Sequence, residues 1–421
     1  MQHAIWARHY RGDAFVHYLY RVKSTAPSQG AQSAPGSQSS LREANRLRVI
    51  DALHDNGALT QVEIAQSTGL SPATVSNVVK ELDAGRAVGL SPSVRNGRRA
   101  VLVSLMTPDG LLAGITFGDR DVRIAIGTSV EDVVGRQRLP LPANHSADEG
   151  LQRASRLLVD LVERAGKSMD QIAAIALGLP APIDSVTGQV GSEGILPGWR
   201  GVDVATEMRS LTSAPVVLDN TANLAALGEL KVGRLQGVQN ALFIKASYGV
   251  GAGLILNGSL FRGSAGTAGE IGHVTIDENG PICRCGNRGC LDTYVGSAAI
   301  LAAVAHSHGP MTLRDVINLA ADGDLGCRRV FEDCGRHLGV AVAGVVNLIN
   351  PEVVMLGGQL RKVGDILLGP MRESIDRRAI PSAAASVTLV QSALGEEADV
   401  LGALVTAAQS RSKHNDLEFK S

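Results

Sequence analysis

Apolar residues recur at helical spacing near the start of the chain. A first helix is predicted from about Ser40 to Asn56-Gly57, with one apolar face formed by Ala44, Leu47, Ile50 and Leu53. Thr60 and Glu63 have the spacing of a capping box, and the short helix that they begin ends at Gly69.

A third helix is predicted from Ser71-Pro72 to about residue 84, because Ser caps helices and Pro fits their first position. Its valines and Leu82 face inward. The residues left facing outward are small or polar: Ser71, Ala73, Thr74, Ser76, Asn77 and Lys80.

Two strands are predicted next, at residues 87–90 and 100–105, and Asn96-Gly97 between them predicts a tight turn. Three helices followed by a hairpin with a basic tip are typical of a winged helix-turn-helix. The third helix suits a major groove, and three arginines at the tip can reach phosphates or a minor groove: Arg95, Arg98 and Arg99. A small helical protein-binding module is the alternative, but the agreement of cap, turn and hairpin favours duplex DNA.

From residue 107 to 409 strands and helices alternate, which predicts an α/β domain of two lobes. Strands are expected at residues 111–118, 122–127, 133–139, 172–179, 216–218, 241–246, 251–256, 353–356 and 386–391, and helices at 149–165, 221–232 and 397–409. Residues 410–421 are polar and expected to fray. Residues 1–40 are predicted to be a disordered extension, because residues 24–40 are a Ser/Pro/Gly/Gln linker.

Composition narrows the function. The 421 residues include 40 Lys or Arg and 41 Asp or Glu, a net charge of −1, which excludes a globally basic nucleic-acid coat. Residues 41–104 hold eight basic and six acidic residues, so DNA affinity is expected to need a dimer on two half-sites. No bilayer-spanning run and no secretory signal is recognised, and the five cysteines suggest a reducing compartment; a cytoplasmic protein is predicted.

Four metal-binding side chains lie within eighteen residues. The segment GEIGHVTIDENGPICRCGNRGCLD contains His273, Cys283, Cys285 and Cys290. Three thiolates and one imidazole match a closed, four-coordinate structural Zn²⁺ site. Reduced core cysteines beside a core histidine are the alternative, and the C-x-C-x4-C spacing argues against it. Cys327 and Cys334 are expected to be plain core residues.

The same segment resembles the ROK family (repressors, open reading frames, kinases). Further matches are GLPAPID at 178–184, LPGW at 196–199, DNTAN at 219–223, GVGAGLILNG at 249–258 and LGG at 356–358. The resemblance covers residues 107–409 and implies a two-lobed, actin-like (ribonuclease H-like) ATPase fold. With the winged helix at 41–106 in front, the chain is similar to the family's N-acetylglucosamine and xylose repressors, and residues 107–421 are predicted to bind an effector and form a homodimer or homotetramer.

The resemblance also implies a sugar site. Its matching positions here are Asn220, Glu270, His273 and Asp292. Carboxylates accept hydrogen bonds from vicinal hydroxyls, and an amide both donates and accepts. His273 can offer one ring nitrogen to the metal and the other to a sugar hydroxyl.

Several positions depart from the family's kinases. The general base of those kinases is an Asp, and Thr221 stands at that position. Thr116 and Asp119 replace an Asp and a Gly of the first phosphate loop, and Tyr248 is a bulky residue in the second. Because phosphoryl transfer depends on positioning and charge stabilisation, these changes predict no kinase activity.

The sequence therefore predicts a sugar-responsive transcription regulator, most simply a repressor of carbohydrate metabolism, that binds operator DNA and a sugar or sugar phosphate. An active hexose kinase with an appended DNA-binding domain is the second hypothesis. A scaffold that binds another protein, such as a phosphotransfer component, is the third. The loss of an acid at Thr221 adds the hypothesis that a 6-phosphorylated sugar is tolerated.

Overall fold

The computed structural model describes residues 38–418, apart from 85–86, 96–97, 106–109, 143–144, 185–186, 191–195 and 200. The predicted extension up to residue 37 and the hairpin turn Asn96-Gly97 lie outside the described residues. The chain divides into two compact units, Met1–Thr107 and Pro108–Ser421. In the described part of the chain, no helix is both long and apolar enough to cross a membrane.

The first unit packs helices α2 (Gln38–Asn56), α3 (Gln61–Thr68) and α4 (Pro72–Ala84) against a three-stranded sheet. The sheet has the order β1-β3-β2, from β1 (Leu59–Thr60), β2 (Val88–Arg95) and β3 (Arg98–Leu105). The predicted capping box is present: Thr60 N–H donates to Glu63 Oε2 at 2.7 Å, and Glu63 N–H donates to Thr60 Oγ1 at 3.3 Å. Gly69 ends α3 with a φ of 69°, as predicted.

Two predictions for this unit were wrong in detail. The buried residues of α2 are Val49, Ala52 and Leu53, whereas Leu47 is 43% exposed. The core formed with α3 and α4 includes only the carboxyl-terminal half of α2, so the predicted face extends too far toward the helix start. The hairpin strands are longer than predicted, and β1 is too short for a pattern to reveal.

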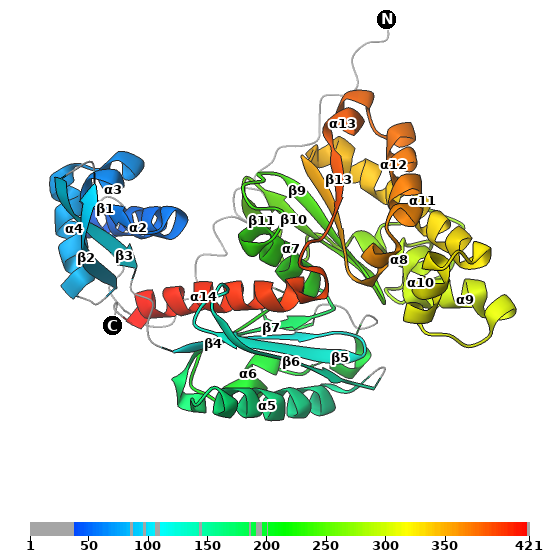
Figure 1. Ribbon diagram of the computed structural model, residues 1–421, viewed down its shortest axis with the longest axis horizontal. Helices are drawn as coiled ribbons and strands as arrows, with labels where there is room; N and C mark the ends of the chain where they lie inside the picture. Colours follow the sequence, from blue (N-terminus) through cyan, green and yellow to red (C-terminus); the bar gives the residue numbers. More distant parts are fainter. Residues whose placement is uncertain are drawn as a thin grey trace, which may run out of the picture. The chain divides into compact units, whose positions relative to one another are not determined.

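The first lobe of the second unit is a five-stranded sheet of order β6-β5-β4-β7-β8. Its strands are β4 (Leu111–Phe117), β5 (Asp121–Gly127), β6 (Val133–Pro140), β7 (Ile172–Leu179) and β8 (Val216–Asn220). The first three form the predicted antiparallel meander, and β7 and β8 run parallel to β4. Helices α5 (Ala147–Arg164) and α6 (Val204–Arg209) cover one face (Figure 1).

The second lobe repeats this topology with the order β11-β10-β9-β12-β13. Its strands are β9 (Ala241–Ala246), β10 (Val250–Leu256), β11 (Ser259–Phe261), β12 (Val353–Gly357) and β13 (Thr388–Gln391). The helices of this lobe are α8 (Asp292–Val295), α9 (Ser297–His308), α10 (Leu313–Ala321), α11 (Leu325–Ile349), α12 (Asp365–Arg378) and α13 (Pro381–Ser386). Because α13 ends at Ser386, the last strand starts two residues later than predicted.

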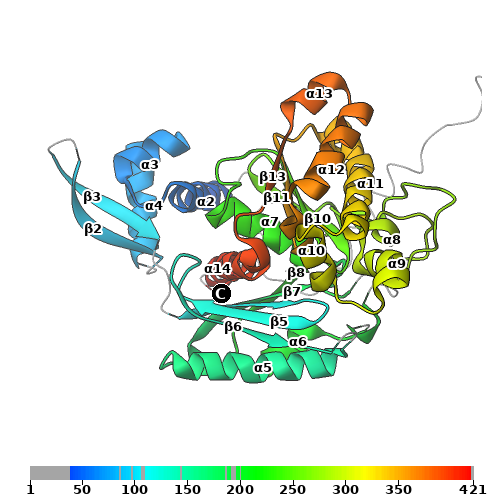
Figure 2. The ribbon, with the colours of Figure 1, turned by 45° about the vertical axis from the view of Figure 1, so that its right-hand side comes forward.

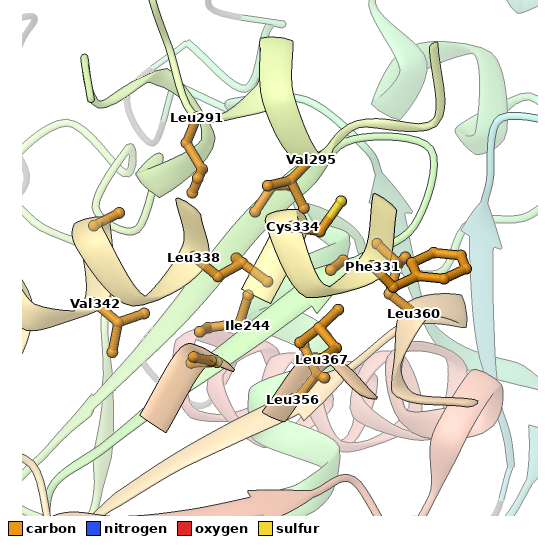
Figure 3. Close-up of a cluster of buried hydrophobic side chains, with 14 of the residues drawn as sticks. Ile244, Leu291, Val295, Phe331, Cys334, Leu338, Val342, Leu356, Leu360 and Leu367 are labelled. Carbon is orange, nitrogen blue, oxygen red and sulfur yellow. The ribbon is translucent and has the colours of Figure 1, made fainter. Parts of the chain in front are cut away.

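Figure 3 shows the core of the second lobe, where Phe331, Leu338 and Leu367 meet residues of the sheet. Cys334 lies in this core and Cys327 is buried in the same cluster, as predicted for both. Short 3₁₀ turns complete the unit: η1 (Met169–Gln171), η2 (Pro197–Trp199), η3 (Ile271–His273), η4 (Gln359–Val363) and η5 (Gly395–Glu397).

Two helices, α7 (Thr221–Val232) and α14 (Ala398–Glu418), lie between the two sheets (Figure 2). They approach closely because Gly228 and Gly402 lack side chains; a Cβ on Gly402 would clash with the Leu224 carbonyl. The predicted end of α14 was wrong: the helix continues beyond residue 409 to Glu418.

Candidate functional site

A cavity of about 680 Å³ in the second unit is lined by residues of both lobes. The first lobe contributes the turn after β4 and the β8–α7 junction. The second lobe contributes the β9–β10 turn, η3 and the cysteine-containing segment. The four residues predicted for sugar binding all line this cavity: Asn220, Glu270, His273 and Asp292.

Asn220 is held from two sides. As the N-cap of α7, its Oδ1 accepts the Ala222 N–H at 2.6 Å. Its Nδ2 donates to the Ala181 carbonyl at 2.9 Å and reaches Glu270 Oε1 at 3.4 Å. The helix cap therefore aims the amide N–H₂ toward the cavity wall.

The acidic residues of the cavity have different surroundings. Asp292 begins α8; its Oδ1 accepts the Val250 N–H at 3.0 Å, and its Oδ2 lies 3.4 Å from Arg284 Nη2. Burial, and then the charge of Asp292, raise the pKa of Glu270 to about 7. Burial also lowers the pKa of His273. A half-buried pair of carboxyl groups beside an amide and an imidazole is suited to a polyhydroxylated ligand.

The predicted metal ligands come together. The candidate ligand atoms of His273, Cys283, Cys285 and Cys290 lie within 4.8 Å of one another. Cys285 and Cys290 Sγ are 3.7 Å apart, and His273 Nδ1 is 3.6 Å from Cys283 Sγ. A tetrahedral ion with metal–sulfur bonds of about 2.3 Å needs S···S edges of about 3.8 Å. The donor set and spacing therefore fit one four-coordinate metal ion and are compatible with zinc.

The positions that the sequence analysis expects to differ from the family's kinases also surround the cavity. Thr221, Asp119 and Tyr248 line it, and Thr221 is only 2% exposed. Asp219, the carboxylate two residues before Thr221 in the chain, does not line the cavity. Its Oδ1 accepts from the Asn220 N–H and Asn223 Nδ2, and its Oδ2 pairs with Arg262 Nη2 at 2.7 Å. Asp219 is therefore occupied by these partners and does not face the cavity in which a general base would act.

A buried ion cluster in the cavity wall was not predicted from the sequence. Thr116 Oγ1 lies 3.3 Å from a carboxylate oxygen of Asp399, which also pairs with Arg123 and Lys245. The available signal was a single cation in each of two apolar strands, DVRIAIG and ALFIKA. A charged residue is rarely buried unless it has a partner.

In the first unit, α4 buries Val75, Val78, Val79 and Leu82, as predicted. Ser71, Ala73, Asn77 and Lys80 are exposed, and Thr74 and Ser76 are partly exposed. Ser71 Oγ accepts the Thr74 N–H at 3.1 Å, the predicted cap. The side chains of the predicted wing-tip residues Arg95, Arg98 and Arg99 lie outside the described part of the structure, although the strand register pairs Arg95 with Arg98.

Family models match both units. The winged helix-turn-helix DNA-binding model matches residues 42–84, and the ROK family model matches residues 112–410. The chain belongs to the ROK family. Its two-lobed fold and the winged helix in front confirm the fold class expected from the sequence.

Transcription repressors and a kinase of the ROK family are both similar to this chain. The xylose repressor of Caldicellulosiruptor bescii is 31% identical over 390 residues, covering 88% of this chain and 96% of that protein. The glucokinase of Halalkalibacterium halodurans is 32% identical over 314 residues, covering 70% of this chain and 94% of that protein. The crystal structure of a ROK family transcriptional regulator, a homologue of the E. coli MLC protein, superposes with a TM-score of 0.74 at 26% identity, covering 90% of this chain and 98% of that one.

Proposed function

We propose that this ROK protein is a DNA-binding transcription regulator of carbohydrate metabolism, acting as a repressor, whose second unit senses a sugar and does not phosphorylate it. One observation carries the proposal: α4, a helix with an exposed face of small and polar residues, precedes the ROK domain. The resemblance adds that Thr221 takes the position of the kinases' general base. Alignment with the xylose repressor over both units supports it.

The DNA-binding residues are those of α4 and the hairpin. Residues 71–80 supply an exposed face without large apolar side chains, which suits contact with base edges in a major groove. We assign Asn77 to a base edge, because an Asn amide can pair with adenine, and Lys80 to a phosphate. A homodimer acting on two half-sites in the cytoplasm completes this assignment.

The absence of kinase activity follows from charge and geometry. Thr221 cannot accept a proton near neutral pH. Thr116 is buried against Asp399, and Asp119 adds a negative charge to the cavity wall. A nucleotide phosphate would be repelled by the charge of Asp119. With Thr116 in place of an acid, the site would also lack the carboxylate that organises a metal ion in kinases.

His273, Cys283, Cys285 and Cys290 would hold a structural Zn²⁺. The ion would supply no reaction chemistry; it would fix the segment that contains Cys283 and Arg284 in the cavity wall. Because His273 Nδ1 faces Cys283, its Nε2 is the nitrogen left for a ligand hydroxyl. A sugar in contact with both Asn220 and Glu270 would touch both lobes. It would shift the protein's population between open and closed arrangements of the lobes.

Fluorescence anisotropy with upstream DNA fragments tests the proposal. Wild-type protein is expected to bind a palindromic fragment with strong salt dependence. Asn77→Ala is expected to weaken binding to that fragment about tenfold with little effect on unrelated DNA. Lys80→Ala is expected to weaken both and reduce the salt slope by about one. If the purified protein prefers no DNA fragment over unrelated DNA, DNA recognition by this chain alone is contradicted. A preference that appears only when cell extract is added would contradict it as well.

The glucokinase relative makes a hexose kinase the second candidate. A coupled assay of ATP consumption against a panel of hexoses separates the two. Turnover at background level is expected for every sugar, and steady turnover with any of them would establish the kinase instead.

A further inference from the structure

A cluster of buried charges connects the two lobes at the floor of the cavity. Asp399 lies in the first turn of α14 and is 2% exposed. Helix α14 follows the last strand of the second lobe in the chain but packs on β4 and β7 of the first lobe. Asp399 therefore lies where the chain crosses from one lobe to the other.

The first lobe provides donors from two neighbouring strands. Thr116 on β4 and Arg123 on β5 are directly paired in the sheet register. Their neighbours Ile115, Val122 and Ile124 pack in the core on the α5 side of this sheet, so Thr116 and Arg123 point to the α14 side. Thr116 Oγ1 and Arg123 Nη1 lie 3.3 and 3.1 Å from Asp399 Oδ1.

The second lobe provides the third donor. Along β9, Leu242, Ile244 and Ala246 pack in the core with α11 and α12. Lys245 alternates with them along the strand and therefore faces α14. Lys245 Nζ lies 2.6 Å from Asp399 Oδ2. The same carboxylate thus joins a strand of each lobe, one through each oxygen.

An outer layer strengthens the connection. Arg138, on β6, pairs with Asp121 at 2.5 Å and with Glu396 at 3.1 Å, and Lys362, in η4 of the second lobe, pairs with Glu396 at 2.7 Å. Glu396 lies two residues before α14. Every bridge between the lobes in this cluster passes through the start of α14.

The buried charges depend on one another. Burial alone would raise the pKa of Asp399, but Arg123 and then Lys245 outweigh it and hold that pKa below its ordinary value. Burial lowers the pKa of Lys245, against the attraction of Asp399. Removing Asp399 leaves two buried cations without the carboxylate that joins them, which costs far more than the intact cluster does.

We propose that Asp399, Arg123 and Lys245 form a latch that holds the two lobes in the arrangement seen in the structure and sets the barrier that an effector must overcome. The latch depends on contacts to both sheets, because a change in the angle between the lobes separates Lys245 from Arg123. Its existence does not depend on the proposed function; only its regulatory role does.

Distance measurement between spin labels tests the latch in the ligand-free, full-length protein without DNA. Labels are placed at exposed Asp160 on α5 and exposed Arg329 on α11, through a non-natural amino acid that leaves the cysteines untouched. Wild-type protein is expected to give one narrow distance distribution. Lys245→Met and Asp399→Asn are each expected to broaden it or add a second population. The matched control is Lys231→Met, on the exposed surface of α7, which is expected to match wild type.

The double variant Lys245→Met/Asp399→Asn removes one charge of each sign and is the safeguard against misfolding. If both residues act through one contact, its distribution is expected to be no broader than that of the worse single variant. Folded variants with the narrow wild-type distribution would overturn the latch. Equal broadening in Lys231→Met, or loss of folded protein in the double variant, would also overturn it. If the spin-label distances support the latch but the protein binds neither a sugar nor operator DNA, the proposed function is refuted and the latch is not.

Discussion

Asn220 uses the two ends of its side-chain amide for different purposes. Its Oδ1 caps α7, and its Nδ2 reaches Glu270 in the cavity. Ser can also cap a helix but is too short to reach Glu270, whereas Ala can do neither. Asn220→Ala is therefore expected to lower the free energy of unfolding by about 1 kcal/mol, and Asn220→Ser by a few tenths of a kcal/mol.

Both variants are expected to weaken sugar binding about tenfold or more, because both remove the amide that is proposed to hydrogen-bond the sugar. Urea unfolding measures the first effect. Titration calorimetry, with a sugar that binds wild-type protein, measures the second. Wild-type affinity in Asn220→Ser would show that the amide does not contact the ligand.

Cys290 and Cys334 are both buried, but of the two only Cys290 belongs to a candidate metal-binding group. Cys290→Ser is expected to reduce bound zinc from about one ion per chain to a small fraction, because three-ligand sites of this kind are open and weaker. Cys334→Ala, the matched control in the core of the second lobe, is expected to keep the metal. Metal analysis after dialysis checks both. Equal zinc in Cys290→Ser and wild type would refute the assignment.

At the scale of elements, two helical glycines in different surroundings give opposite predictions. Gly402→Ala is expected to destabilise the protein by about 1–3 kcal/mol or more, since the added methyl group would clash with the backbone of α7. Gly344→Ala, on α11, has no atom within 4 Å of the new Cβ and is expected to stabilise by up to about 1 kcal/mol. Chemical denaturation measures both. A neutral Gly402→Ala would mean that α7 and α14 do not pack this closely.

The sequence pattern predicted elements well where strands are buried on both faces. Strand β7 and helix α7 have their predicted bounds, because apolar runs and a capping Asn mark their ends. The pattern failed where tertiary contacts decide which residues are buried. The buried face of α2 depends on which half of that helix contacts α3 and α4. The candidate metal ligands are close in sequence, and the structure brings them together. Asp399, in contrast, lies 276 residues from Arg123, and no local pattern relates them.

At the scale of the whole molecule, the two units matter only if binding at one changes binding at the other. The cavity lies wholly within the second unit, and the candidate DNA-binding helix lies in the first. A sugar that binds one conformation more tightly shifts the population toward it, by no more than the ratio of its two affinities.

Thermodynamic linkage makes this coupling reciprocal. If a sugar weakens operator binding by some factor, the operator must weaken sugar binding by the same factor, expected to be about 5- to 150-fold. Calorimetry with sugar alone and with the protein–operator complex gives one factor, and anisotropy with and without sugar gives the other. Asn220→Ala should bind operator normally and need about tenfold more sugar, or more, for the same response. Sugar binding that leaves operator affinity unchanged would contradict regulation of DNA binding by the sugar. A ligand with equal affinity for both conformations does not shift the equilibrium between them, however tightly the cavity holds it.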